Sequence, residues 1–369
     1  MNTRIEEGFV NSKGKRAESW FDKSTADYWR HERGYRILNA LNKDTSWITV
    51  GDGRFGLDSV RIKEKGLKNV LPTDLCTTLL EEGKRREIID EYRVFNVETM
   101  EIEETFDYVF CKEAYHHFFK PINALYNMLK IARKGVVLTE PNDNSSNVVY
   151  TNYESVGNYV YSLSKQELIK IAISLNYPSV CYWEYNDYYI DGCEYEPADE
   201  SRSEIFKKIK FTIKEMDQRV KEGTMDYNMI SFIIFKEVLS EVEIKRLREM
   251  GCTYISLPRN PYLGEFVVKE DKYYIYGTGY TAKIVKKHLL ERDIEILGYV
   301  DSNPEKWGTY FEDKKIISPE ELVISVGEAN VKVIIASMYN QEIYEKITNL
   351  GIINEKIIIS PFNTRIEIK

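Results

Sequence analysis

Short apolar runs alternate with longer amphipathic segments along residues 48–141, and this alternation constrains the fold more than any other feature of the chain. Runs such as 106–111 have the length and composition of buried strands, whereas 121–132 repeats apolar residues at helical spacing. Two parallel strands need a long crossover connection, usually a helix, so strands that alternate with helices indicate parallel βαβ units. We therefore expect an α/β fold with a doubly wound sheet.

Three further segments complete the predicted first domain. Residues 18–41 repeat apolar and aromatic groups at helical spacing, behind Ser24 or Thr25, either of which has a side chain suited to an N-cap. Apolar runs at 179–185 and 229–238 predict two more strands. Added to the five parallel βα units, this strand pair predicts a seven-stranded sheet.

The alternation restarts near residue 272, behind a stretch that contains two prolines and a glycine. At 369 residues, the chain is long enough for two separate cores. We expect a first domain over 1–238 with an aromatic-rich substrate region near 150–198, a linker over 239–265, and a second, smaller α/β domain over 266–369. Tyrosines of the segment 150–164 and residues Asp187 to Tyr189 are candidates to line a substrate pocket, with sheet or core packing as the alternative.

A glycine-rich turn follows the first predicted strand. Gly51, Gly53 and Gly56 form the pattern G-x-G-x-x-G, in which the backbone approaches a ligand closely and the N-terminus of the next helix faces negative charge. Asp74 ends the second predicted strand about 20 residues later, where its carboxylate can accept hydrogen bonds from both hydroxyls of a ribose. This arrangement serves NAD and S-adenosylmethionine equally, so the turn by itself leaves both open.

A series of elements follows the second strand in a fixed order. Asn96 to Glu98 come after the third predicted strand, the block "FDYVFCKEAYHHF" holds the fourth, and "ARKGVVLTEP" leads into the fifth. Over about residues 20–240, this series resembles the class I S-adenosylmethionine-dependent methyltransferases, most closely those with a "KEAYHHF" block, often found among sugar- and cell-surface-modifying enzymes. The resemblance implies a methyltransferase sheet, S-adenosylmethionine as the cofactor, and a cofactor site built from Gly51, Asp52, Gly53, Gly56, Asp74, Asn96, Val97, Glu98 and Cys111.

One position departs from that family. An acidic residue usually stands two residues before the first glycine, and this chain has Thr49 there. The contact to the amino group of the cofactor's methionine moiety must then come from Asp52 inside the turn, from a backbone carbonyl, or from a group outside the motif.

Candidate catalytic residues follow the fourth strand. A base is needed if the methyl acceptor is a hydroxyl or an ammonium group, and an imidazole accepts a proton at neutral pH. Either His116 or His117 is the candidate base, the alternative being a histidine that caps the next helix or packs under the cofactor. Glu113 and Glu140 stand at strand ends and could hold a substrate hydroxyl or ammonium. Arg30 could meet the methionine carboxylate, although an exposed helical arginine is the default expectation.

The second domain has a glycine turn of its own, at Gly277, Gly279 and Ala282, with Asp301 closing the next strand. The turn and the block "GYVDSNPEKWG" resemble the Rossmann-like domain found beside methyltransferases and in sugar-modifying acyltransferases. The resemblance implies a nucleotide or nucleotide-sugar ligand. A purely structural or dimerising domain is the alternative.

Charge and apolar content restrict the partners and the location. The net charge is −8 and no basic block stands out, which argues against a nucleic-acid partner. The longest apolar runs are far shorter than the roughly 20 residues of a spanning helix, and the N-terminus lacks a signal-peptide core, so we expect a cytoplasmic protein. No ligand spacing supports a metal, and the five scattered cysteines suit reduced, buried thiols: Cys76, Cys111, Cys181, Cys193 and Cys252.

These features predict transfer of a methyl group from S-adenosylmethionine to a small polar acceptor, such as a saccharide or nucleotide-sugar precursor. The chain could also form a homo-oligomer. One alternative is an NAD(P)-dependent oxidoreductase, which explains both glycine turns but not the series around the fourth and fifth strands. The other is a catalytically silent protein that binds the cofactor or a nucleotide, a reading that Thr49 keeps open.

Overall fold

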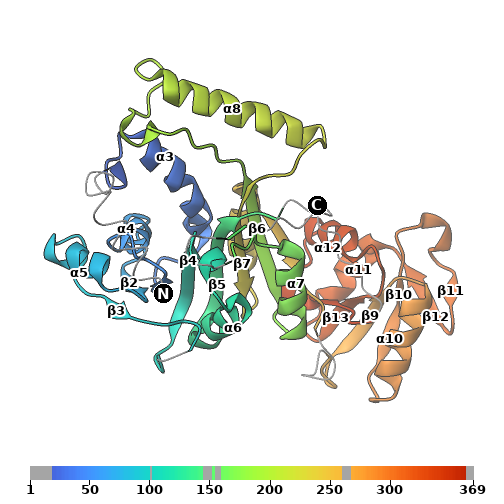
Figure 1. Cartoon of the computed structure of the whole chain (residues 1–369). Coiled ribbons are helices and arrows are strands. Elements are labelled where there is room, and N and C mark those ends of the chain that lie inside the picture. Colours follow the sequence, from blue (N-terminus) through green and yellow to red (C-terminus); the bar gives the residue numbers. More distant parts are fainter. Residues whose placement is uncertain (1–18, 100–101, 144–151, 154–158, 260–266, 363–369) are drawn as a thin grey trace. The chain divides into compact units, whose positions relative to one another are not determined.

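The computed structural model describes residues 19–99, 102–143, 152–153, 159–259 and 267–362, which form two sheets (Figure 1). The chain divides into two compact units. The first unit comprises Met1–Lys165, Cys181–Lys236 and Lys245–Tyr254, and the second comprises Gln166–Val180, Glu237–Ile244 and Ile255–Lys369. The domain limits inferred from the sequence stay a prediction.

The first sheet has eight strands in the order β3-β2-β1-β4-β5-β7-β6-β8. Strands β1 to β5 pair in parallel, and β7 runs antiparallel to β5. The strands are β1 (Ser46–Val50), β2 (Asn69–Asp74), β3 (Arg93–Val94), β4 (Phe106–Lys112), β5 (Ala132–Pro141), β6 (Ser179–Tyr185), β7 (Met229–Phe235) and β8 (Thr253–Ser256). The α/β class is as predicted, but the sheet has one strand more than the predicted seven. Strand β8 has four residues beside a proline-containing stretch, too few to show a period in the sequence.

The α-helices before and between the strands of this sheet are α3 (Ala26–Glu32), α4 (Leu57–Glu64), α5 (Thr78–Arg85), α6 (Pro121–Ile131), α7 (Lys165–Ser174), α8 (Glu204–Lys221) and α9 (Glu241–Glu249). Helix α9 and strand β8 both lie in the segment 239–265 that the sequence marked as a linker, of which residues 260–265 lie outside the described part. Three short 3-10 helices accompany them: η1 (Arg33–Ala40), η2 (Tyr115–His117) and η3 (Cys193–Tyr195).

The segment 18–41 does not form the single helix that its periodicity predicted. Thr25 is the N-cap of α3, since its side chain accepts a hydrogen bond from the backbone N–H of Tyr28 at 3.1 Å. The α-helix ends at Glu32 and continues as 3-10 helix. Inside this 3-10 segment, the hydroxyl oxygens of Thr139 and Ser231 each lie 3.2 Å from the carbonyl oxygen of Gly34.

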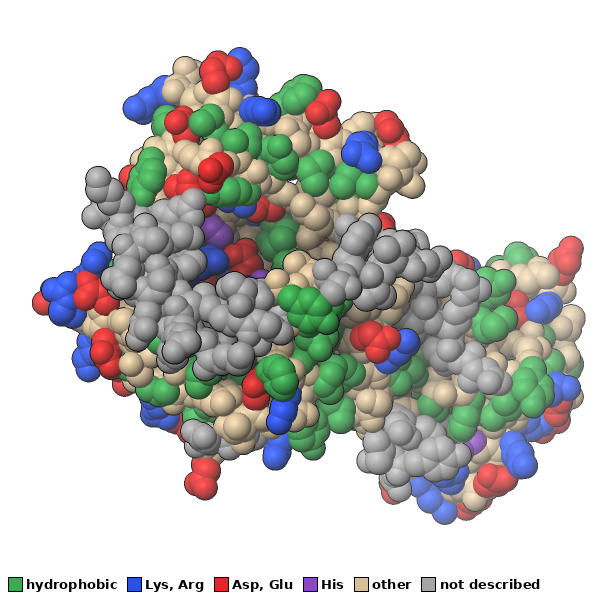
Figure 2. Space-filling model, viewed as in Figure 1, with side chains coloured by type: hydrophobic (Ala, Val, Ile, Leu, Met, Phe, Trp, Pro, Cys, Tyr) green, Lys and Arg blue, Asp and Glu red, His purple; other side chains and the backbone are tan. Residues whose placement is uncertain are grey.

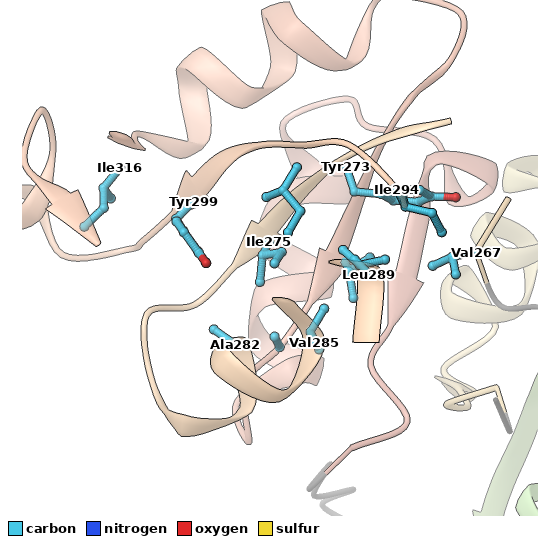
Figure 3. Packing of buried hydrophobic residues seen from close by; sticks show 12 residues of the cluster. Val267, Tyr273, Ile275, Ala282, Val285, Leu289, Ile294, Tyr299 and Ile316 are labelled. Carbon is cyan, nitrogen blue, oxygen red and sulfur yellow. The ribbon is translucent and has the colours of Figure 1, made fainter. Parts of the chain in front are cut away.

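The second sheet has six strands in the order β11-β12-β10-β9-β13-β14, and only β11 and β12 pair antiparallel. The strands are β9 (Lys272–Tyr276), β10 (Ile296–Val300), β11 (Tyr310–Phe311), β12 (Lys314–Ile317), β13 (Val331–Ile335) and β14 (Ile357–Ile359), and the helices are α10 (Tyr280–Leu290), α11 (Pro319–Val326) and α12 (Asn340–Asn349). The sequence predicted alternating strands and helices from residue 272 onward, as found in β9, α10, β10, β13, α12 and β14, but it did not predict the β11–β12 hairpin or α11. Ala282, Val285 and Leu289 of α10 pack on the face of this sheet beside Ile275 and Tyr299 (Figure 3).

The cysteines and the apolar content of the helices bear on two expectations from the sequence. The five cysteines are all buried and none forms a disulfide, as the sequence predicted. Among the described residues, no helix combines the length and the apolar content needed to cross a bilayer.

Helix α11 offers a local test of stability. The Ser318 side chain accepts from the backbone N–H of Glu321 at 3.1 Å, and the Glu321 carboxylate accepts from the backbone N–H of Ser318 at 3.0 Å, which is a complete capping box. We expect Ser318→Ala to destabilise α11 by about 1 kcal/mol. Hydrogen exchange should show about fivefold lower protection of the α11 amides. Ser325→Ala, on the same helix, is the control, and equal protection in both variants would contradict the expectation.

Candidate active site

The glycine turn after β1 packs closely against the loop after β4. Gly51 has a φ of +75°, and a Cβ atom there would lie 2.4 Å from the Cβ of Ala114. Gly53 is buried in the same turn, and Gly56, also at a φ of +75°, directly precedes α4. Only glycine fits at the first of these positions, because a side chain there would meet both backbone strain and Ala114.

Asp74 lies where the sequence placed it, at the carboxyl end of β2. Strands β1 and β2 pair in parallel with Val50 opposite Thr73, so Asp74 stands beside the glycine turn. One carboxylate oxygen of Asp74 accepts a hydrogen bond from the backbone N–H of Cys76 at 2.8 Å. Asp74 thus places an acidic group at the carboxyl edge of the sheet, which is where α/β sheets bind nucleotides.

Asp52 points into its own turn. Its side chain is buried and accepts hydrogen bonds from the backbone N–H groups of Asp58 at 2.8 Å and Ser59 at 2.9 Å and from the Thr49 hydroxyl at 2.8 Å. Burial, and then the charge of Asp58, raise the pKa of Asp52 well above its ordinary value. Thr49 and Asp52 together tie the turn to the start of α4, and this arrangement favours a structural role for Asp52 over contact with an ammonium group.

The segment after β3 is also held by local contacts. The Asn96 side chain accepts from the backbone N–H of Glu98 at 3.0 Å, and the Glu98 carboxylate accepts from the backbone N–H of Lys120 at 2.7 Å, just before α6. The Val97 side chain is buried, and its carbonyl accepts from the Asn127 amide at 2.7 Å. The Glu98 side chain therefore stabilises the start of α6.

Cys111 lies within β4 and is fully buried. Burial, with the charge of Glu140, raises the pKa of its thiol well above the ordinary value. A thiol in this environment is a packing group rather than a nucleophile.

A cavity of about 360 Å³ opens at the carboxyl edge of the first sheet. Figure 2 shows histidine, acidic and basic side chains gathered in a hollow of this face. The cavity brings together the three predicted catalytic residues with others from α3, the glycine turn and the segment after β6. Its lining residues are Trp20, Asp27, Arg30, His31, Arg54, Glu113, His116, His117, Pro141, Tyr189, Glu194 and Met229.

His116 and Glu140 form a hydrogen-bonded pair at the border of this cavity. The His116 Nδ1 atom lies 2.5 Å from Oε2 of Glu140, whose side chain is fully buried. The other oxygen of Glu140 accepts from the backbone N–H groups of Ala114 at 3.1 Å and Tyr115 at 2.9 Å. If Glu140 acts only as an acceptor in this pair, Nδ1 carries the proton and Nε2 is the ring nitrogen that would accept one. Glu140 does not line the cavity, so it orients His116 instead of holding a substrate group as the sequence suggested.

His117 also lines the cavity, with its ring centroid 3.9 Å from that of His116. Its backbone N–H donates to the carbonyl of Ala114 at 3.0 Å, which helps to form the η2 turn. The sequence did not separate the two histidines. The contact with Glu140 distinguishes them, because it gives the ring of His116 a defined orientation.

Glu113 lies in the left-handed region, with a φ of +49°, directly after β4. Its carboxylate accepts from Lys112 Nζ at 2.8 Å and lies 3.4 Å from Arg54 Nη1 and 3.8 Å from His31 Nδ1. Although burial opposes its charge, Lys112, His31 and Arg54 hold the pKa of Glu113 well below its ordinary value. Glu113 is therefore a stable anion near neutral pH and a weak base.

Arg30 is not the exposed helical residue that the sequence favoured. It is 9% exposed, it donates from Nε to Asp187 at 3.1 Å and from a second nitrogen to the same carboxylate, and it lies 3.4 Å from Asp27. Two carboxylates thus neutralise its charge, which makes Arg30 a poor partner for a ligand carboxylate. Of the aromatic-rich region, Tyr189 lines the cavity, while residues 144–151 and 154–158 lie outside the described part of the chain.

Sequence reasoning missed His31 and Asp27 as members of the site. They stand one helical turn apart on α3, and His31 Nε2 lies 3.5 Å from Asp27 while Lys112 lies 3.2 Å from its Nδ1. Burial, with the charge of Lys112, lowers the pKa of His31. The spacing of the two residues on one helix face was the available signal. In the described part of the chain, no group of three or more histidines, cysteines and acidic residues could hold a metal ion.

The second glycine turn follows the same plan in the second unit. Gly277 has a φ of +116° after β9, Gly279 is the N-cap of α10, and Ala282 is fully buried in the core. Asp301 accepts at one carboxylate oxygen from the Thr278 hydroxyl at 2.6 Å and Lys306 Nζ at 2.8 Å. Although partial burial opposes its charge, these bonds lower the pKa of Asp301. Gly277, Gly279 and Asp301 therefore lie at one sheet edge, whereas Ala282 packs in the core beneath it.

Two segments match known protein families. Residues 48–139, from β1 to the end of β5, match the methyltransferase domain family, and residues 269–358 match the family described as C2185-like, N-terminal. The first match supports an S-adenosylmethionine-dependent methyltransferase, with S-adenosylmethionine as the cofactor, and does not favour an oxidoreductase. The second match names no ligand, so the nucleotide-sugar ligand stays a prediction.

No curated protein matches the chain significantly. Among solved structures, the YcgJ protein of Bacillus subtilis is 13% identical, with a TM-score of 0.39, over 57% of this chain and 99% of that one. A possible histamine N-methyltransferase of Thermotoga maritima is 15% identical, with a TM-score of 0.39, over 64% and 100%. Magnesium protoporphyrin IX methyltransferase of Synechocystis PCC 6803, solved with bound SAH, is 11% identical, with a TM-score of 0.36, over 63% and 98%. At these identities, the function proposed below rests on the family match and on the residues of the site.

Proposed function

We propose that the first unit transfers a methyl group from S-adenosylmethionine to a hydroxyl or ammonium group of a small polar acceptor, with His116 as the general base. The observation that carries this proposal is the 2.5 Å contact between His116 Nδ1 and the buried carboxylate of Glu140, at the border of a cavity near the glycine turn. A histidine oriented in this way can act as a general base through its second ring nitrogen, Nε2.

The residues around the glycine turn suit the cofactor. Gly51 lets the turn approach Ala114 of the loop after β4 closely, and Asp74 stands next to the turn as the acid for a ribose. Val97 and its neighbours after β3 border the same edge of the sheet. When bound, S-adenosylmethionine supplies a methyl group activated by the positive charge of its sulfonium.

The protein contributes position and proton transfer. Glu140 fixes the orientation of His116, and the backbone bonds from Ala114 and Tyr115 fix Glu140 in turn. Holding the acceptor and the methyl donor in line accounts for much of the rate enhancement in such a displacement. Removal of the acceptor's proton by His116 makes the attacking atom a stronger nucleophile.

We propose a saccharide or nucleotide-sugar precursor as the acceptor. The cavity of about 360 Å³ falls within the usual size for small-molecule sites, which is roughly 300–1,000 Å³. Most of its lining side chains are charged or hydrogen-bonding, and Trp20 and Tyr189 add aromatic faces. A sugar presents both hydroxyl groups and apolar ring faces, so this mixture supports it as the acceptor class.

Calorimetric titration with S-adenosylhomocysteine, NAD⁺ and NADP⁺ tests the cofactor. We expect micromolar binding of S-adenosylhomocysteine, at least tenfold weaker in Asp74→Ala because a ribose then loses a charged hydrogen-bond acceptor. Asp90→Ala, which removes an exposed aspartate of the same unit, is the control and should bind as the wild type does. Binding of a dinucleotide but not of S-adenosylhomocysteine would overturn the proposal.

Transfer of a labelled methyl group to a panel of nucleotide sugars, free saccharides and simple amines tests the acceptor. We expect label on a saccharide-containing member of the panel. Label only on amines would overturn the saccharide assignment and leave the methyltransferase standing. Tight cofactor binding without transfer to any acceptor would favour the catalytically silent protein.

A further inference from the structure

We infer that Arg54 and Glu113 form the subsite for the α-amino acid end of the cofactor, with Arg54 facing the carboxylate and Glu113 facing the ammonium group. This inference rests on the proposed function, in which the first unit binds S-adenosylmethionine. It assigns two residues of this chain to a part of the ligand for which Thr49 leaves no acidic partner in the usual place.

The two residues follow the carboxyl ends of adjacent parallel strands. Arg54 belongs to the glycine turn after β1, and Glu113 follows β4, which pairs with β1. Their side chains lie 3.4 Å apart, from Arg54 Nη1 to Glu113 Oε2, and both line the cavity. A cation and an anion at this separation match the opposite charges of a zwitterionic amino acid.

Exposure separates this pair from the other charged groups nearby. The Arg54 side chain is 36% exposed and that of Glu113 is 21% exposed, whereas Arg30 is 9% and Lys112 is 2% exposed. Arg54 and Glu113 can therefore be reached from the cavity, while Lys112 contacts Glu113 from the buried side.

The surroundings allow the pair to exchange partners. Lys112 donates to Glu113 at 2.8 Å, so Glu113 keeps a cationic partner when Arg54 binds a ligand carboxylate. The guanidinium of Arg54 also lies over the Trp20 ring, 5.4 Å from its centroid, which holds the side chain at the cavity wall. Glu113 stays ionised near neutral pH, as an ammonium ligand requires.

The other candidates are already engaged. Asp52 is buried and accepts three hydrogen bonds within its own turn. Arg30 is paired with both Asp187 and Asp27. Among the charged groups that the sequence suggested for this end of the ligand, neither offers an accessible charge.

Two ligands that share the adenosine and thioether groups test this assignment. S-adenosylhomocysteine has the α-amino acid end, and 5′-methylthioadenosine lacks it. By calorimetry, we expect Arg54→Ala and Glu113→Gln to weaken S-adenosylhomocysteine binding about 10- to 100-fold, the loss typical of a charged hydrogen bond. Binding of 5′-methylthioadenosine should stay within about twofold, because that ligand carries no charge for either residue to meet.

Arg133→Ala provides the matched control. It removes an arginine that is also paired with a carboxylate, 3.2 Å from Asp107, at the amino end of β5 and thus at the opposite edge of the same sheet. It should leave both affinities unchanged. Circular dichroism of each variant identifies any loss of fold.

The outcomes separate the inference from the proposed function. Equal weakening of both ligands in Arg54→Ala, or an unchanged affinity for S-adenosylhomocysteine, would overturn the inference while leaving the methyltransferase standing. A wild-type protein that binds neither ligand would overturn both.

Discussion

Replacing His116 with glutamine is expected to lower kcat for methyl transfer by about 10²- to 10⁴-fold, the usual contribution of a general base. Glutamine can still donate to Glu140 but cannot take the acceptor's proton. Binding of S-adenosylhomocysteine should stay within about twofold. The measurement is labelled methyl transfer to the best acceptor of the panel, with calorimetry on the same preparations.

Glu140→Gln should have a comparable effect by a different route. A glutamine carbonyl can accept from the backbone N–H groups of Ala114 and Tyr115, while its NH₂ group donates to His116 Nδ1. This exchange places the ring proton on Nε2, the wrong tautomer for a base. The pH dependence gives a second readout, because the rise in rate as the base loses its proton should be absent in both variants.

A histidine of the second unit supplies the control for these experiments. His288→Gln changes a residue whose ring nitrogen contacts Arg292 at 3.0 Å on α10, and it should transfer methyl groups at the wild-type rate. Loss of activity in His117→Gln but not in His116→Gln would assign the base to His117 and refute the pair with Glu140.

The second large effect is expected at the glycine turn. Gly51→Ala places a Cβ atom 2.4 Å from that of Ala114, at a φ of +75°. The backbone strain alone costs about 1–3 kcal/mol, and the overlap must displace the turn or the loop after β4. We expect more than tenfold weaker binding of S-adenosylhomocysteine and a melting temperature lower by several degrees. Calorimetry and thermal unfolding measure the two effects.

A matched glycine separates strain from overlap. Gly223 lies after α8 with a φ of +70° and has no atom within 4 Å of the position of a Cβ. Gly223→Ala should therefore lower stability through strain only and leave cofactor binding intact. Adding Ala114→Gly to the Gly51→Ala variant should restore part of the affinity. If Gly51→Ala and Gly223→Ala change stability and cofactor binding to the same extent, the close approach of the turn to Ala114 does not contribute to cofactor binding.

The first sheet illustrates how far local pattern carries a fold prediction. The run 179–185 predicted β6 at its observed bounds, Ser179–Tyr185, because five of its seven residues are apolar or aromatic and it lies between Pro178 and Asn186. The third predicted strand, which precedes Asn96, spans only Arg93–Val94 in the structure, since a strand end depends on the neighbour with which it pairs. The segment 18–41 shows the same limit, because its α-helix ends at Glu32 and continues as a 3-10 helix that packs against side chains of β5 and β7.

The candidate site shows the same division. The sequence placed Gly51, Asp74, Glu113 and His116 at strand ends, and parallel strands necessarily bring their carboxyl ends to one edge. It gave no means to see that Glu140 contacts His116 or that Arg54 contacts Glu113, because each pair joins different strands. It also treated Arg30 as exposed, since a helical pattern does not reveal which carboxylates lie opposite.

By itself, the sequence determined the α/β class, the order of most strands and helices, the glycine turns and the methyltransferase resemblance. These properties depend on the spacing of residues along one segment, which the chain carries without reference to any other part. Only the tertiary structure decided the contact between His116 and Glu140, the neutralised charge of Arg30 and the Arg54–Glu113 pair. Each of these depends on distances of a few ångströms between side chains distant in sequence, and such distances exist only once the strands have paired and the core has packed.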